Sequence, residues 1–223
     1  MQTKLTDKWR SFLIRLPSLY FGLFLFALGA VMILYADLGM SPWGVFQVGL
    51  MNSVGLTFGQ ASQVVGLGVL VLGWLLGFPP GFGTVMNMYF IGYFIDRIIK
   101  WGIVPRFNNL GMQLVLLVGG MVMIGVASYF YLRPKLGAGP RDGLMIGLVQ
   151  KLDRPVGQVR GGIEVTVTVL GYLMGGPIGL GTVITALSIG YFVQLAFKLG
   201  NYDRNAKHMN LYELAKYLSI SQS

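Results

Sequence analysis

The sequence contains no cysteine, one histidine and few charged residues. The lack of cysteine excludes disulfides, thiolate catalysis and cysteine-ligated metals. The single histidine, His208, lies in a polar C-terminal stretch, so we expect no histidine-based metal cluster or catalytic triad. Charged residues make up 11% of the 223 positions and apolar residues 54%. A soluble domain carries about 25% charge, so this composition excludes an ordinary soluble domain, a disordered chain and a coiled coil.

Long runs without any charge occupy most of the chain. They are 16–36 (21 residues), 38–95 (58 residues), 107–132 (26 residues) and 165–197 (33 residues). A helix that spans a bilayer needs about 20 mostly apolar residues. The sequence therefore predicts an all-α integral membrane protein with about six full spans, with the lipid bilayer as its surroundings.

The net charge is +9. In a soluble protein this excess would suggest nucleic acid, but in a membrane protein basic residues typically hold cytoplasmic loops against anionic lipid, so no nucleic-acid partner is expected. Residues 1–17 combine four basic residues with Trp9, Phe12 and Leu13 and lack a small-residue cleavage site. This pattern predicts an interfacial helix that leads into the first span.

The chain repeats itself when it is shifted by 98 residues. Residues 20–100 match 118–198 without gaps at 25 of 81 positions, and Gly77–Val85 against Gly175–Val183 is the clearest stretch. Apolar composition produces chance matches of Leu and Gly, but not of Pro, Thr, Gln and Tyr in one register. Duplicated membrane halves are typical of transporters, whose site lies between the halves near the midplane.

Each half has the same predicted parts: a span, a Gly/Pro-rich break, a short helix of about 12 residues, a second span, another break and a third span. Such a short helix covers only ~18 Å of the ~30 Å core. We therefore divide the chain into an interfacial helix (1–17), a first membrane repeat (18–100), a connecting loop (101–109), a second repeat (110–198) and a cytoplasmic tail (199–223). An apolar stripe in the tail predicts one more short helix, at Leu211, Leu214, Ala215 and Leu218.

The topology depends on whether the short helices cross. If they cross, the protein has eight spans and parallel halves; if they are re-entrant, it has six spans and inverted halves. Either model places 14 basic residues inside and 3 outside, with both termini in the cytoplasm. We favour inverted repeats, because 12 residues do not cross unaided and inverted halves are common in transporters.

Four charged residues of the second repeat are candidates for a binding site. Glu164 falls about 10 Å into a predicted span, and Arg160 lies four residues earlier on the same face. The two could form an ion pair that reaches the interface, or they could bind a substrate or a proton. Arg141 and Asp142 begin the second short helix, where Asp142 could cap the helix or Arg141 and free N–H groups could bind an anion.

The first repeat has Trp43, Gly44, Ser62 and Gly66 at the corresponding positions, so the polar site is built mainly by the second repeat. Trp43 would add an apolar wall. Thr84 and Thr182 begin the last spans, where they could cap the helix or contact a ligand. Gln158 completes the candidate set. We expect no catalytic residues, metal or cofactor, because no HExxH, Ser/His pair, P-loop or Rossmann fingerprint is present.

These motifs resemble one group of proteins. Gly137–Met145, Val159-Arg160 with Ile163-Glu164, and Gly175–Ile184 are similar to the bacterial YczE/YyaS/YitT-type integral membrane proteins, most of all to the YczE branch, over about residues 18–200. The resemblance implies a multi-pass protein of the bacterial cytoplasmic (inner) membrane. It brings no catalytic residues with it.

The sequence thus predicts a permease for a small organic anion or zwitterion, with a site between the repeats and Glu164 as the group for proton coupling. The alternative is a scaffold or regulatory subunit that transports nothing, and an intramembrane enzyme is a weaker third reading. Substrate, direction and oligomeric state stay open, a homodimer included.

Overall fold

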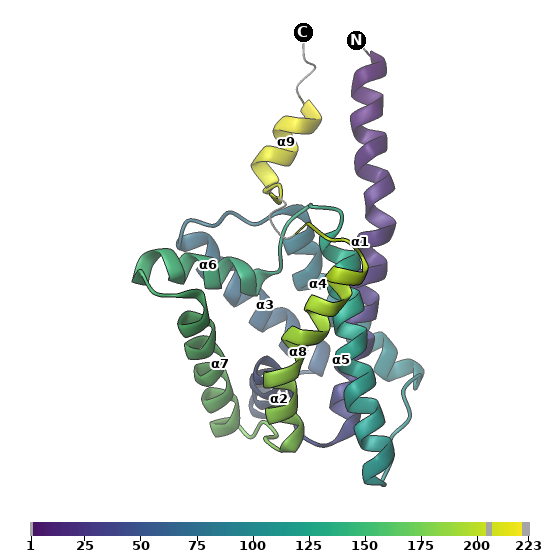
Figure 1. Ribbon diagram of the computed structural model, residues 1–223, viewed down its shortest axis with the longest axis vertical. Helices are drawn as coiled ribbons and strands as arrows, with labels where there is room; N and C mark the ends of the chain where they lie inside the picture. Colours follow the sequence, from purple (N-terminus) through teal and green to yellow (C-terminus); the bar gives the residue numbers. More distant parts are fainter. Residues whose placement is uncertain (1, 204–206, 220–223) are drawn as a thin grey trace.

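The computed structural model describes residues 2–203 and 207–219, and within them it contains helices and no strand (Figure 1). The all-α prediction is confirmed for this part of the chain. The helices are α1 (Gln2–Ala36), α2 (Pro42–Val54), α3 (Phe58–Leu75), α4 (Phe82–Trp101), α5 (Leu110–Leu132), α6 (Pro140–Leu152), α7 (Val156–Leu173), α8 (Leu180–Leu199) and α9 (Leu211–Ser219).

Four of the described helices are long and apolar enough to cross a membrane. They are α1 from residue 7 onward, α3, α5 and α8. The sequence predicts six full spans, and the two others coincide with α4 and α7. These helices are 20 and 18 residues long, but α4 carries Asp96, Arg97 and Lys100 and α7 carries Arg160 and Glu164, which lower their hydropathy. Their spanning character stays a prediction.

The helices recur at the predicted offset. The bounds of α2, α3 and α4 become those of α6, α7 and α8 when 98 is added to each. Left-handed backbone recurs in the same register, at Asp37 (φ 55°) and Lys135 (φ 58°) and at Gly39 (φ 100°) and Gly137 (φ 134°). The same local structure therefore forms twice, although most residues differ between the two segments.

The short helices α2 and α6 lie at different levels along the molecule's long axis (Figure 1). Each has 13 residues, about 20 Å of helix, which is less than the ~30 Å of a bilayer core. The start of α1 and the helix α9 lie at one end of the molecule, and α6 lies nearer to that end than α2 does (Figure 1). We call this the basic end, because most of the Lys and Arg residues belong to segments that lie there.

The predicted interfacial segment 1–17 is not a separate helix. The structure joins its described part to the first span in one continuous helix, α1, with Pro17 inside it. Proline lacks an N–H and so removes one helical hydrogen bond. Long membrane helices tolerate this loss where neighbouring groups satisfy the freed carbonyl.

The core is centred on the packing of α1 against α5, with α4 on α1 and α8 on α5. One face of α1 carries fully buried residues every four positions, at Leu19, Leu23, Ala27 and Val31. This spacing is the one that keeps side chains on a single helix face. It fixes α1 and α5 as the frame against which the shorter helices are placed.

Two reciprocal backbone contacts join the segments beyond this frame. The Gly83 N–H donates to the Leu136 carbonyl at 2.7 Å, and the Gly181 N–H donates to the Leu38 carbonyl at 2.6 Å. We call these contacts the clasps. Each joins a Gly/Pro break of one predicted half to the Leu-Gly break of the other.

The C-terminal tail closes over the clasp at the basic end. Met209 N–H donates to Lys135 O and Leu211 N–H to Pro80 O, both at 3.0 Å. The predicted tail helix is confirmed as α9, which buries Leu214 and packs against α1. Residues 204–206 and 220–223 of the predicted tail lie outside the described residues.

We predict that Gly137→Ala lowers the stability of the protein. Gly137 has φ +134°, and a Cβ there would lie 2.7 Å from Thr84 Oγ1 and 2.9 Å from the Gly81 Cα. Strained backbone of this kind costs about 1–3 kcal/mol. Thermal unfolding of the purified protein should show a lower Tm for this variant. The control is Gly68→Ala, where a Cβ meets nothing within 4 Å; equal Tm values for both variants would contradict the clasp's importance.

Candidate functional site

A charged cavity of about 350 Å³ lies between α7 and α8. In the first half α3 packs along α4, but the corresponding helices α7 and α8 do not pack along each other. The space between them is closed by α5 and by the first turns of α2 and α6. Its lining includes five predicted site residues: Trp43, Arg141, Asp142, Arg160 and Glu164.

Arg160 and Glu164 form an ion pair within α7. The Arg160 Nε donates to Glu164 Oε1 at 3.0 Å, the i,i+4 spacing that places two side chains on one helix face. Their side chains are 53% and 26% exposed. The ion pair, one of the two alternatives for these residues, is therefore present. It lies on the wall of the cavity, so each charge is compensated by the other.

Asp142 caps the start of α6. Its Oδ2 accepts a hydrogen bond at 3.1 Å from the N–H of Gly139, the residue that precedes Pro140 at the first helical position. Pro140 suits that position, because its missing N–H has no helical partner to lose and its φ is already helical. The carboxylate also favours the positive end of the helix dipole.

Arg141 is the charged residue of this set without a polar partner. Its guanidinium lies over the Trp43 ring, with Cζ 4.6 Å from the ring centroid. Within the part of the chain that the structure describes, its N–H groups donate no hydrogen bond and it joins no ion pair. A guanidinium has five donors in a planar fork that matches a carboxylate. Arg141 is therefore half-buried, held in place by an aromatic face, and free to bind an anion.

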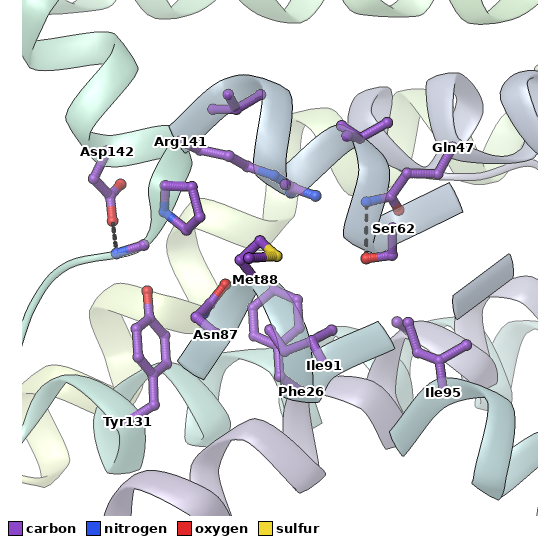
Figure 2. Close-up of a pocket in the computed structure, with 16 residues that line it drawn as sticks. Phe26, Gln47, Ser62, Asn87, Met88, Ile91, Ile95, Tyr131, Arg141 and Asp142 are labelled. Atoms are coloured by element: carbon purple, nitrogen blue, oxygen red, sulfur yellow. Dashed lines mark hydrogen bonds between the residues drawn. The ribbon is translucent and has the colours of Figure 1, made fainter. Parts of the chain in front are cut away.

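A second, smaller cavity of about 180 Å³ also has Arg141 in its lining (Figure 2). Tyr131, Arg141 and Asp142 line both cavities. The rest of this central cavity comes mostly from the first half, and its polar groups are uncharged. Gln47 Nε2 donates to Ser62 Oγ at 3.2 Å.

The two cavities occupy corresponding places in the two segments. Ser62 and Gly66 line the central cavity, and Arg160 and Glu164, 98 residues later, line the charged cavity. Arg141 and Trp43 are also 98 residues apart and stack on each other. The repeated positions thus contribute to two cavities that meet at Tyr131, Arg141 and Asp142, and only the charged cavity is lined by an ion pair.

Three predicted site residues lie elsewhere. Thr84 Oγ1 accepts from Gly81 N–H at 3.0 Å and donates to Ala138 O at 2.6 Å, and Thr182 Oγ1 accepts from Gly179 N–H at 3.1 Å. Both threonines therefore cap helices at the clasps. Gln158 lines an apolar groove on the far side of α7.

The structure also adds residues that the sequence did not single out as site residues. The central cavity is lined by Gln47, Ser62, Asn87 and Tyr131, which come from four different helices. Ser62 could have been predicted from the sequence, because it occupies the position in the first repeat that Arg160 occupies in the second. Among the described residues no group of three His, Asp or Glu side chains could hold a metal ion.

Comparison with known proteins gives a family but no activity. Residues 13–198 match the model of a family of unknown function, DUF6198. An uncharacterized membrane protein of Bacillus subtilis, YczE, is 35% identical over 199 residues, which cover 88% of each chain. An uncharacterized protein of Haemophilus influenzae is 33% identical over 189 residues, 85% of this chain and 86% of its own. The Bacillus subtilis protein YyaS is 25% identical over 182 residues, 74% of this chain and 83% of its own.

No solved structure matches the chain. The family match and the two relatives above 30% identity each cover most of the sequence. The apolar helices agree with the printed description of YczE as a membrane protein. The chain is therefore an α-helical membrane protein of the YczE-like DUF6198 family.

Proposed function

We propose that this protein is a permease for a small organic anion or zwitterion, and not an enzyme. The observation that carries the proposal is Arg141: a guanidinium between two cavities, oriented by Trp43 and without a polar partner among the described residues. A charge in such a place is costly unless a partner compensates it. A carboxylate that enters either cavity supplies that partner.

In this proposal the two halves are inverted repeats. The equal helix bounds at an offset of 98, the reciprocal clasps and the different levels of α2 and α6 along the long axis support it. Substrate sites of such transporters lie at the interface of the repeats, beside the first turns of broken helices. Arg141 and Trp43 belong to the first turns of α6 and α2.

The basic end faces the cytoplasm in this proposal, and the protein lies in the bacterial cytoplasmic membrane. The N-terminal segment, residues 133–160 and residues 198–223 contain 14 basic residues, whereas Arg97, Lys100 and Arg106 belong to the other end. Cytoplasmic loops are the ones enriched in Lys and Arg. The absence of extensive packing between α7 and α8 would give the charged cavity its access path.

We predict that Arg141→Gln weakens anion binding about 10- to 150-fold, which is the range for losing a hydrogen bond to a charged group. A panel of small carboxylates and amino acids, assayed by counterflow in proteoliposomes, identifies a substrate and then measures the loss. Arg133→Gln removes the same charge from an exposed position at the same end and should transport normally. Equal losses in both variants, or no counterflow by the wild type, would favour the non-transporting scaffold.

We predict that Glu164→Gln abolishes accumulation driven by a proton gradient and spares substrate exchange. Glutamine keeps an acceptor for the Arg160 Nε but does not bind and release a proton near neutral pH. Accumulation and exchange are measured in the same proteoliposomes with an imposed pH difference. Glu213→Gln, a surface change outside the membrane helices, is the control. Proton-driven accumulation by Glu164→Gln would refute this role.

Arg160→Ala tests the same pair from its other side. It leaves the Glu164 carboxylate without its ion-pair partner inside the membrane region, so we predict weaker substrate binding. The expected readout is loss of substrate exchange in proteoliposomes. Unchanged exchange would show that the pair does not contribute to the site.

A further inference from the structure

An apolar groove of about 830 Å³ runs along the side of α7 opposite to α8. Helices α2, α3, α6 and α7 form its walls, and its lining is dominated by Leu, Val and Ile side chains with Phe46 and Trp43. Apolar side chains are the ordinary surface of a membrane helix. A groove of this volume between four helices is a different feature, because it can enclose an alkyl chain.

The groove adjoins the charged cavity. Trp43 and Ile163 line both of them. The unpaired guanidinium of Arg141 lies over the Trp43 ring, so an anionic group bound there has the groove directly beyond that ring. An anion site and an apolar site thus meet at one aromatic side chain.

We propose that the substrate is an amphipathic organic anion, whose carboxylate binds Arg141 and whose alkyl chain occupies the apolar groove. The inference rests on the proposed function and narrows its substrate class. Two cationic residues, Lys151 and Arg154, also line the groove, and a membrane lipid could place its phosphate there. They are exposed, however, and can be solvated or contact any headgroup, whereas Arg141 is half-buried and lacks a polar partner.

Gly162 offers a way to fill the groove without disturbing the fold. It is exposed on the groove wall, and a Cβ built there meets nothing within 4 Å. Replacing it by Leu puts a bulky side chain into the groove and favours the helix. Gly161→Leu is the matched control, because a Cβ at Gly161 is equally unobstructed but this residue does not line the groove.

The experiment measures binding of radiolabelled linear monocarboxylates of two, four, six and eight carbons to the protein in lipid nanodiscs, with empty nanodiscs subtracted. Burial of each methylene strengthens binding about threefold to fourfold, so wild type and Gly161→Leu should gain about 700- to 4,000-fold over the six methylenes between two and eight carbons. Gly162→Leu should bind acetate as the wild type does and lose most of that gain. Arg141→Gln should weaken the binding of every chain length.

Three results would overturn the inference. If binding depends on Arg141 but not on chain length, the anion site stands and the amphipathic substrate does not. If octanoate binding survives Arg141→Gln but is lost in Lys151→Ala/Arg154→Ala, the groove holds a membrane lipid. If Gly162→Leu changes only the number of chains in each nanodisc, the groove is an interface between copies. Failure of all carboxylates to bind would remove the proposed anion site as well.

Discussion

The two clasps are the constraint on which the rest of the structure depends. Each break between helices exposes backbone groups that a bilayer does not solvate. In each clasp a break of one half satisfies a break of the other, through a glycine N–H to a leucine carbonyl at 2.6–2.7 Å. Neither half can make these contacts alone. They hold the first turns of α2 and α6 beside the α1–α5 frame, and they therefore place Trp43 and Arg141 against each other.

The two halves have corresponding helices, but these helices pack differently and line different cavities. In the first half α3 packs along α4, and Ser62 and Gly66 line a smaller cavity to which this half contributes no charged residue. In the second half α7 stands away from α8, and Arg160 and Glu164 occupy the corresponding wall. A charged pair is expensive to bury, which is consistent with the larger and more open cavity in the half that carries it.

Much of this was predictable because the repeat is visible in the residues that shape the backbone. Gly39, Gly137 and the threonines of the two Gly-Thr-Val segments recur in register, and the structure places them at the clasps. Helical spacing of apolar residues predicted α9, and the i,i+4 spacing of Arg160 and Glu164 gave their ion pair as one of two alternatives. It did not predict that α1 continues through Pro17, because a proline between basic and apolar residues equally suits a helix boundary. Nor did it separate the capping threonines from ligand contacts, since a hydroxyl at a helix start suits both roles until its partners are known.

What the sequence least reveals is the relation between charges from different helices. Arg141 and Asp142 are neighbours in the chain, which suggests an ion pair between them. Instead, the Asp142 carboxylate accepts a hydrogen bond from the Gly139 N–H, and the Arg141 guanidinium lies over the Trp43 ring. Glu164, the other acidic residue of the charged cavity, forms an ion pair with Arg160. Two acids and two arginines are neutral by count, and Asp142 and Glu164 act on Arg141 electrostatically from a distance, but the guanidinium has no hydrogen-bond acceptor among the described residues. This arrangement follows from the stacking of Arg141, at the start of α6, on Trp43, at the start of α2. It is the basis of our proposal that these residues bind an anion.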